Sequence, residues 1–220
     1  MVNIALVTAK FAFILPFYIK ILGEYGNQPQ SLKTDSEEIV MYAPALNGPS
    51  LSVESAWSPT SENIIGKIGS EPVWEANRIL IDIKRDFSTT KIAKEDQKAL
   101  VNKARDILYK ILILYRWRGK QLQIDVSDIE KVDYRVAYYD AADTLIGQPT
   151  GTSNLVVNLL SRSLKSYQWN DVCEDLVSEA MPELYESLLL DARSVVSKEP
   201  RRAVLDATTA CEVFIKKNLR

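Results

Sequence analysis

The sequence predicts an α+β fold, with a mixed strand and helix domain at residues 1–147 and an all-helical region at residues 154–220. Three observations lead to this prediction. Several segments of the first part alternate apolar and polar residues with a period of two, which is typical of strands. One segment, residues 93–117, repeats apolar residues at steps of three and four, which is typical of an amphipathic helix. After residue 154 only the helical period is found.

The first strand is predicted at Lys10–Lys20 (KFAFILPFYIK), where the odd positions carry large apolar side chains. Such a face fits one side of a buried sheet. The alternative is a membrane or export segment. It is disfavoured because the uncharged run Phe11–Ile19 has nine residues, whereas a bilayer span needs about 20. Pro16 cannot donate a ladder hydrogen bond, so it predicts an edge position, a bulge or a break.

The rest of the first domain contains shorter alternating segments. Arg78–Lys84 (RILIDIK) places three isoleucines on one face, with Asp82 and Lys84 on the other. Further strands are predicted at Glu38–Pro44, Gln121–Val126 and Val132–Tyr138, with a shorter piece at Asn63–Ile65.

Between these strands, Ala93–Trp117 predicts one long helix that packs across the sheet. Gly119 follows it at the expected position of a C-terminal cap, where glycine is favoured. The apolar stripe consists of Leu100, Ala104, Ile107, Ile111 and Leu114, widened by Leu108 and Tyr115.

The helical region follows a predicted linker at Gln148–Ser153 (QPTGTS), which combines proline, glycine and small hydroxyl residues without charge. The short connection between the last two helices predicts an antiparallel hairpin. The expected helices are Asn154–Lys165, a second capped by Asn170 or Asp171, a third with Pro182 in its first turn that ends near Lys198, and a fourth opened by Pro200.

Composition excludes several classes of function. The chain has 27 basic and 29 acidic residues, a net charge of −2, so it has no overall attraction for nucleic acid or anionic membranes. It has no histidine, which excludes Ser-His-Asp and Cys-His hydrolases and histidine-ligated metals within this sequence. Cys173 and Cys211 are expected to be two buried free thiols rather than a disulfide. We therefore expect a cytoplasmic protein without cofactor or metal.

One segment could bind nucleic acid. In YRWRGK, the cations Arg116, Arg118 and Lys120 surround Trp117. Arginine pairs with phosphate and tryptophan can stack on a base, so these four residues are the candidate nucleic-acid site. The alternative is that the cations only stabilise the C-terminus of a helix, where the dipole favours positive charge.

Other candidate sites have simpler explanations. Asp125, Asp128 and Glu130 could ligate a hard cation, but Ser127 with Glu130 also fits a helix capping box. Glu212 lies in a largely apolar helix and could carry a raised pKa. Pairing with Arg193 or Lys216 is the structural alternative. No residue is predicted to be catalytic.

The C-terminal run Leu188–Leu219 carries the segments LLLDA and RRAVLDATTACEVFIKK, separated by a short gap. It resembles the first helix pair of HEPN-type (higher-eukaryote and prokaryote nucleotide-binding) domains. The resemblance implies an all-α bundle from a family that acts in toxin–antitoxin and antiphage systems and whose active members cleave RNA. Their catalytic motif is an arginine followed four to six residues later by histidine. Since histidine is absent here, the nuclease activity does not carry over.

Together these observations predict a non-catalytic binding or assembly protein that resembles the start of a HEPN-type defence or toxin protein. Its C-terminal helices are expected to pair with a second copy or with another protein. The sequence ends inside an apparently continuing helix, which suggests a fragment of a longer frame. Two alternatives remain open: single-stranded RNA binding by the sheet and Arg116–Lys120, and a structural subunit of a larger complex.

Overall fold

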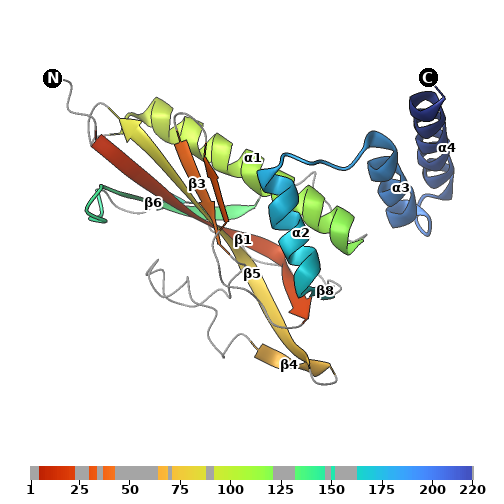
Figure 1. The fold of residues 1–220 in the computed structure, drawn as a ribbon, viewed down its shortest axis with the longest axis horizontal. Helices are drawn as coiled ribbons and strands as arrows, with labels where there is room; N and C mark the ends of the chain where they lie inside the picture. The colour runs from red at the N-terminus through yellow and green to blue at the C-terminus, as the bar shows by residue number, and fades with distance from the viewer. Residues whose placement is uncertain are drawn as a thin grey trace.

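The computed structural model describes residues 5–22, 30–33, 37–42, 64–68, 71–87, 92–120, 132–146, 150–151 and 163–219. It confirms the α+β prediction, because an antiparallel sheet comes first and helices follow (Figure 1). The strands are β1 (Ala5–Leu22), β2 (Gln30–Lys33), β3 (Glu37–Met41), β4 (Ile64–Ile68), β5 (Glu71–Phe87), β6 (Asp133–Tyr139), β7 (Thr150–Gly151) and β8 (Ser163–Lys165). The helices are α1 (Lys94–Gly119), α2 (Ser166–Val177), α3 (Leu184–Val195) and α4 (Pro200–Asn218).

The sheet is built around β1, which pairs antiparallel with β5 on one side and with β6 on the other. The strand order is β2-β3-β5-β1-β6-β7, while β4 pairs with β5 and β8 pairs with β1. The opening stretch is therefore a central strand. Its odd positions are buried, as the alternation predicts, and its apolar character serves the sheet. No helix in the described part of the chain is long and apolar enough to cross a bilayer.

Pro16 lies in an irregularity of β1, as its missing N–H predicts. The register with β5 shifts between Ile14 and Ile19, and pairing with β6 ends at Ile14. Beyond the shift, β1 gains β8 as a parallel partner from Lys20 onward. A proline that lacks an N–H is tolerated here because the ladder is already interrupted on both sides.

Helix α1 covers one face of the sheet and supplies eight residues of the main core (Figure 1). Every member of its predicted apolar stripe is buried. The odd positions of β1 and β5 and the even positions of β6 face this helix, so the side chains interleave in one layer. Tyr115 at the end of α1 is fully buried, and its ring meets Trp169 of α2 edge-on, with 6.5 Å between ring centroids.

The predicted helix at Asn154–Lys165 is wrong at its C-terminal end, because Ser163–Lys165 forms β8. These residues pair with the part of β1 that β6 leaves unpaired, and backbone hydrogen bonds with that edge outweigh the local helical pattern. Helix α2 then begins at Ser166, so Asn170 and Asp171 lie inside it and do not cap it.

The helical region is not uniform in its packing. Helix α2 packs on α1, and its Trp169, Val172 and Leu176 belong to the same core as the sheet. Helices α3 and α4 instead pack on each other, as the predicted hairpin requires. Lys217 near the end of α4 forms a 2.5 Å ion pair with Glu183 at the start of α3, so the two helices are antiparallel. Pro200 is the first residue of α4, as predicted.

Two predictions about other segments have different outcomes. The strand at Gln121–Val126 and the acidic set Asp125, Asp128 and Glu130 lie outside the described residues. Of the predicted linker, Thr150–Gly151 forms β7 and pairs with Arg135 and Val136 of β6.

Candidate functional site

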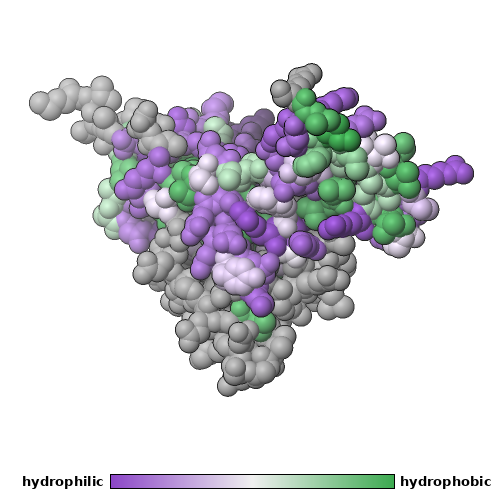
Figure 2. Space-filling view, turned by 45° about the vertical axis from the view of Figure 1, so that its right-hand side comes forward, coloured by the Kyte–Doolittle hydropathy of each residue, from purple (hydrophilic) through white to green (hydrophobic). Residues whose placement is uncertain are grey.

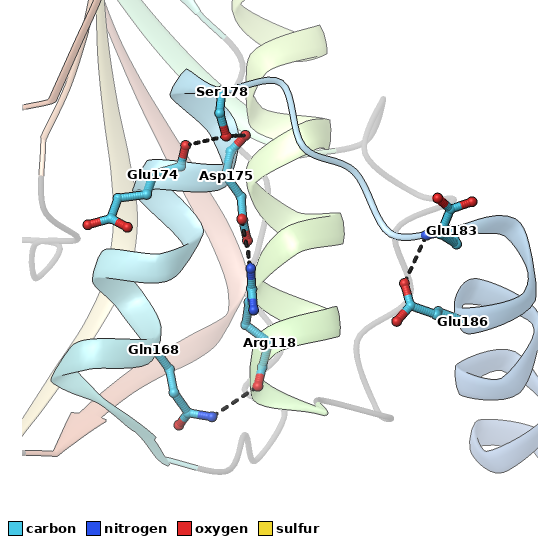
Figure 3. Close-up of polar contacts among 7 residues, drawn as sticks. All are labelled: Arg118, Gln168, Glu174, Asp175, Ser178, Glu183 and Glu186. Carbon is cyan, nitrogen blue, oxygen red and sulfur yellow. Dashed lines mark hydrogen bonds and ion pairs between the residues drawn. The ribbon is translucent and has the colours of Figure 1, made fainter.

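The candidate nucleic-acid segment lies at the end of α1, where the structure gives its arginines partners within the protein. Arg118 forms a bidentate ion pair with Asp175 of α2, with 2.6 Å from Nε to Oδ2 and 2.7 Å from Nη2 to Oδ1 (Figure 3). The hydrogen bonds that Arg118 donates to Asp175 raise the pKa of Arg118 above its ordinary value. Gln168 donates from Nε2 to the Arg118 carbonyl at 3.0 Å, so α2 contacts both the side chain and the backbone of this residue.

Arg116 points to a different helix. Its Nη1 lies 2.7 Å from Oδ1 of Asp191 in α3. Two arginines that are neighbours on one turn of α1 therefore hold two different helices, α2 and α3. The guanidinium of Arg118 also stacks over the ring of Trp117, 4.4 Å from its centroid.

Lys120 is exposed and ends the helix in the left-handed conformation, with φ 49° and ψ 43°. The helix thus ends one residue later than expected from Gly119. These contacts support the structural alternative for this segment. The guanidinium groups of Arg116 and Arg118 form ion pairs within the protein, and the ring of Trp117 is contacted by Arg118. RNA binding by the segment stays a prediction, and Lys120 is the residue that tests it without disturbing an ion pair.

A second cluster, which sequence reasoning missed, lies on the face of the sheet opposite α1. We call Lys10, Tyr42, Arg78, Asp82 and Arg135 the polar face cluster. The strand registers bring them together, because Lys10 pairs with Asp82 across β1 and β5 and Ala12 lies between Leu80 and Arg135. Arg78 and Asp82 are buried even though they carry charge. The alternation in Arg78–Lys84 places Asp82 on the face opposite the isoleucines, but a local pattern does not indicate that Asp82 is buried on that face as well.

Asp82 is the centre of the polar face cluster. It is 3 % exposed, and Tyr42 donates its hydroxyl to Oδ2 at 3.1 Å. Its Oδ1 is buried without a hydrogen-bond partner in the described structure. Burial raises the pKa of Asp82 to about 6, although Lys10 and the Tyr42 hydrogen bond oppose the rise. Burial and the nearby Asp82 charge raise the pKa of Tyr42 as well.

The ammonium of Lys10 is shared between several groups. It lies 2.9 Å from Oδ1 of Asp143 and over the ring of Tyr139, 4.5 Å from the centroid. The cluster therefore holds a carboxyl group that changes charge near pH 6 beside a fixed cation. This arrangement can respond to pH, and its consequences for stability are testable.

A third feature is an apolar surface on the C-terminal hairpin. We define the α3–α4 surface as six large side chains that are 48–67 % exposed: Leu184, Val196, Val204, Leu205, Phe214 and Ile215. Figure 2 shows hydrophobic residues gathered on the side of the molecule where α3 and α4 lie. The buried Ala203 and Ala210 mark the side of α4 that meets α3, and the ring of Phe214 contacts that of Tyr185 in α3, with 5.2 Å between centroids.

The remaining candidates have structural roles. Glu212 is exposed and lies 3.9 Å from Lys216, so the pairing alternative is confirmed. Both cysteines are free, as predicted. Burial raises the pKa of the Cys173 thiol to about 12, whereas Cys211 is exposed and the expectation of a buried thiol is wrong there. Cys211 follows Ala210 by one position, which turns it away from α3.

Within the described residues, no group of three or more cysteine, aspartate and glutamate side chains is placed to hold a metal ion. Comparisons of the chain with protein-family models, with curated proteins and with solved structures found no match.

Proposed function

We propose that this chain is a cytoplasmic binding and assembly protein that docks on another protein surface through the α3–α4 surface. One observation carries the proposal: six large apolar side chains of the hairpin are 48–67 % exposed, whereas most apolar side chains of the described sheet and of α1 lie in the core. Contiguous exposed apolar surface costs free energy in water, and it marks interaction sites in proteins that otherwise bury such residues. The hairpin would act as the first helix pair of a HEPN-like bundle, with a protein partner covering its open side.

A catalytic role is not part of the proposal. The chain has no histidine, and the two arginines nearest to a candidate ligand site are held in ion pairs. The sheet domain would serve as the rigid support for the hairpin, since Arg116 connects the end of α1 to Asp191 of α3.

The test uses the double variant Val204→Ser with Leu205→Ser. Both side chains are more than half exposed, so folding should be unaffected. Sedimentation velocity of the chain purified from its native host should show a complex heavier than the 24.8 kDa chain, and the double variant should sediment as the monomer. Lys198→Ser, an exposed polar position in the preceding turn, is the matched control and should leave the complex intact.

The proposal fails if the wild type sediments as a monomer at every concentration and the same host proteins co-purify with the wild type and with the double variant. Circular dichroism of both variants shows whether the helices are retained, so loss of the complex can be separated from loss of the fold.

A further inference from the structure

The outer face of α4 carries a stripe with a regular composition. Val204, Thr208, Cys211 and Ile215 follow one another at steps of four, three and four, so they lie on one side of the helix. All four are exposed, and Val204 and Ile215 remain 65 % and 51 % accessible. None carries a charge. This spacing is that of the seam by which two helices pack in a coiled coil.

The stripe is also symmetric about its own midpoint. Read in either direction it runs large, small, small, large, and the midpoint falls between Thr209 and Ala210. A two-fold axis at that point would bring Val204 opposite Ile215 of a second copy, and Thr208 opposite Cys211. An interface between identical copies must be complementary to itself in this way. An antiparallel pair also sets the two helix dipoles in the favourable sense.

The available area fits a weak dimer. With the flanking Leu205 and Leu219, which are 67 % and 81 % exposed, the stripe offers on the order of 500 Å² of apolar surface per copy. Two copies would then bury about 1,000 Å², which lies at the lower limit for a specific interface.

We infer that α4 pairs antiparallel with α4 of a second copy of this chain, through the stripe Val204, Thr208, Cys211 and Ile215. The inference rests on the proposed function and names the partner that covers this side of the hairpin. The small side chains at the centre let the helices approach closely, and the larger ones close the ends.

Disulfide cross-linking tests the direction of the pair. In a Cys211→Ser background, Val204→Cys and Ile215→Cys are prepared as separate proteins, mixed and oxidised. Antiparallel pairing predicts that the mixed 204–215 product dominates. Two copies of position 204 would be about 16 Å apart along the axis, at 1.5 Å per residue, which is too far for a disulfide. Dominant 204–204 and 215–215 products would overturn the antiparallel arrangement.

Two neighbouring threonines provide a matched pair for the interface itself. Thr208 and Thr209 are both exposed, and each donates its hydroxyl to the carbonyl four residues earlier. Thr208→Glu places a charge in the stripe, so it should shift the dimer to monomer in sedimentation equilibrium. Thr209→Glu lies off the stripe and should leave the dimer unchanged. Equal effects of the two variants would contradict the inference.

The outcomes also separate the inference from the proposed function. The purified chain could stay monomeric and fail to cross-link, while the double variant Val204→Ser with Leu205→Ser still loses a bound host protein. This result would refute pairing with a second copy and would support docking on a different protein. A chain with neither self-association nor partner refutes both.

Discussion

Burial disfavours the ionised form of the Asp82 carboxyl group. The carboxyl group lies on the covered second face of the sheet, with one oxygen bonded to Tyr42 and the other without a partner in the described structure. Lys10 and Lys84 offset only part of the desolvation, since the pKa still rises from 3.8 to about 6. A buried carboxyl of this kind makes the stability of the fold depend on pH.

We predict that Asp82→Asn removes this pH dependence. Because the pKa is higher in the folded state, folding takes up a proton, and the contribution of Asp82 is fully present below its unfolded pKa. That contribution is lost as pH rises through the folded value near 6. The wild type should therefore lose about 2 kcal/mol from this group between about pH 4 and pH 7. Urea denaturation across this range measures it, and Asp82→Asn should give a flatter profile.

Asp86→Asn is the control for this prediction, because Asp86 is an exposed acidic residue on the same strand. It should keep the slope of the wild type. A profile for Asp82→Asn that matches the wild type would show that the carboxyl does not titrate in this range.

Arg118 is the second residue whose surroundings permit a sharp prediction. Its bidentate pair with Asp175 holds a carboxylate that is only 11 % exposed. Arg118→Ala should reduce the free energy of unfolding by about 2 kcal/mol, because the buried carboxylate loses its partner. Asp175→Asn should recover part of this loss in the double variant, and a double-mutant cycle by chemical denaturation measures the coupling. Additive effects would contradict a direct pair.

At the scale of single elements, α1 shows how a helix end is chosen. The sequence places Gly119 where a left-handed cap is expected, yet the left-handed residue is Lys120. Its backbone N–H bonds to the carbonyls of Arg116 and Trp117, and this closes the helix one residue further on. Arg118 and its contacts with α2 lie in this last turn, so tertiary packing extends the helix past its glycine.

We predict that Lys120→Gly stabilises the protein by about 0.5–1 kcal/mol, because glycine adopts the left-handed conformation without strain. Thermal or urea unfolding checks this. Lys110→Gly, at an exposed position inside α1, is the matched control and should cost about 1 kcal/mol. If Lys120→Gly is destabilising, the left-handed cap is not present in solution.

The same variant tests the RNA alternative. Lys120 is exposed, so its loss should weaken binding of single-stranded RNA and reduce the salt dependence of that binding if the segment contacts phosphate. Unchanged or absent RNA binding would remove the alternative, and the variant would still be folded.

At the scale of the whole molecule, the end of α1 connects two parts that pack differently. Arg118 holds α2 against the sheet core, while Arg116 holds α3 and, through it, the hairpin. Among the residues that the structure describes, the ion pair between Arg116 and Asp191 therefore sets part of the orientation of the proposed docking surface.

We predict that Arg116→Ala increases backbone amide hydrogen exchange in α3 and α4 and leaves the sheet protected. Arg118→Ala should instead raise exchange in α2. Native-state hydrogen exchange read by mass spectrometry distinguishes the two, since local opening reports the stability of each unit. Increased exchange in the same segments for both variants would show that the two ion pairs hold one cooperative body.

The sequence determined the type of each main element. An element that is buried on one side has apolar residues that recur with a period of 2 in a strand or 3.6 in a helix. Four features could be predicted for this reason: the odd face of β1, the whole stripe of α1, the irregularity at Pro16 and the hairpin whose second helix begins at Pro200. Each depends on neighbours in the chain or on the properties of a single side chain.

Tertiary structure alone decided the rest. Ser163–Lys165 became a strand because β1 had an unpaired edge, and no local pattern reports what lies across a sheet. The polar face cluster was assembled by registers between distant strands. Arg116 pairs with Asp191 and Arg118 pairs with Asp175, and each partner lies 57 residues or more further along the chain. Local sequence encodes which face of an element is buried, whereas the identity of the group it meets depends on contacts that only the folded chain makes.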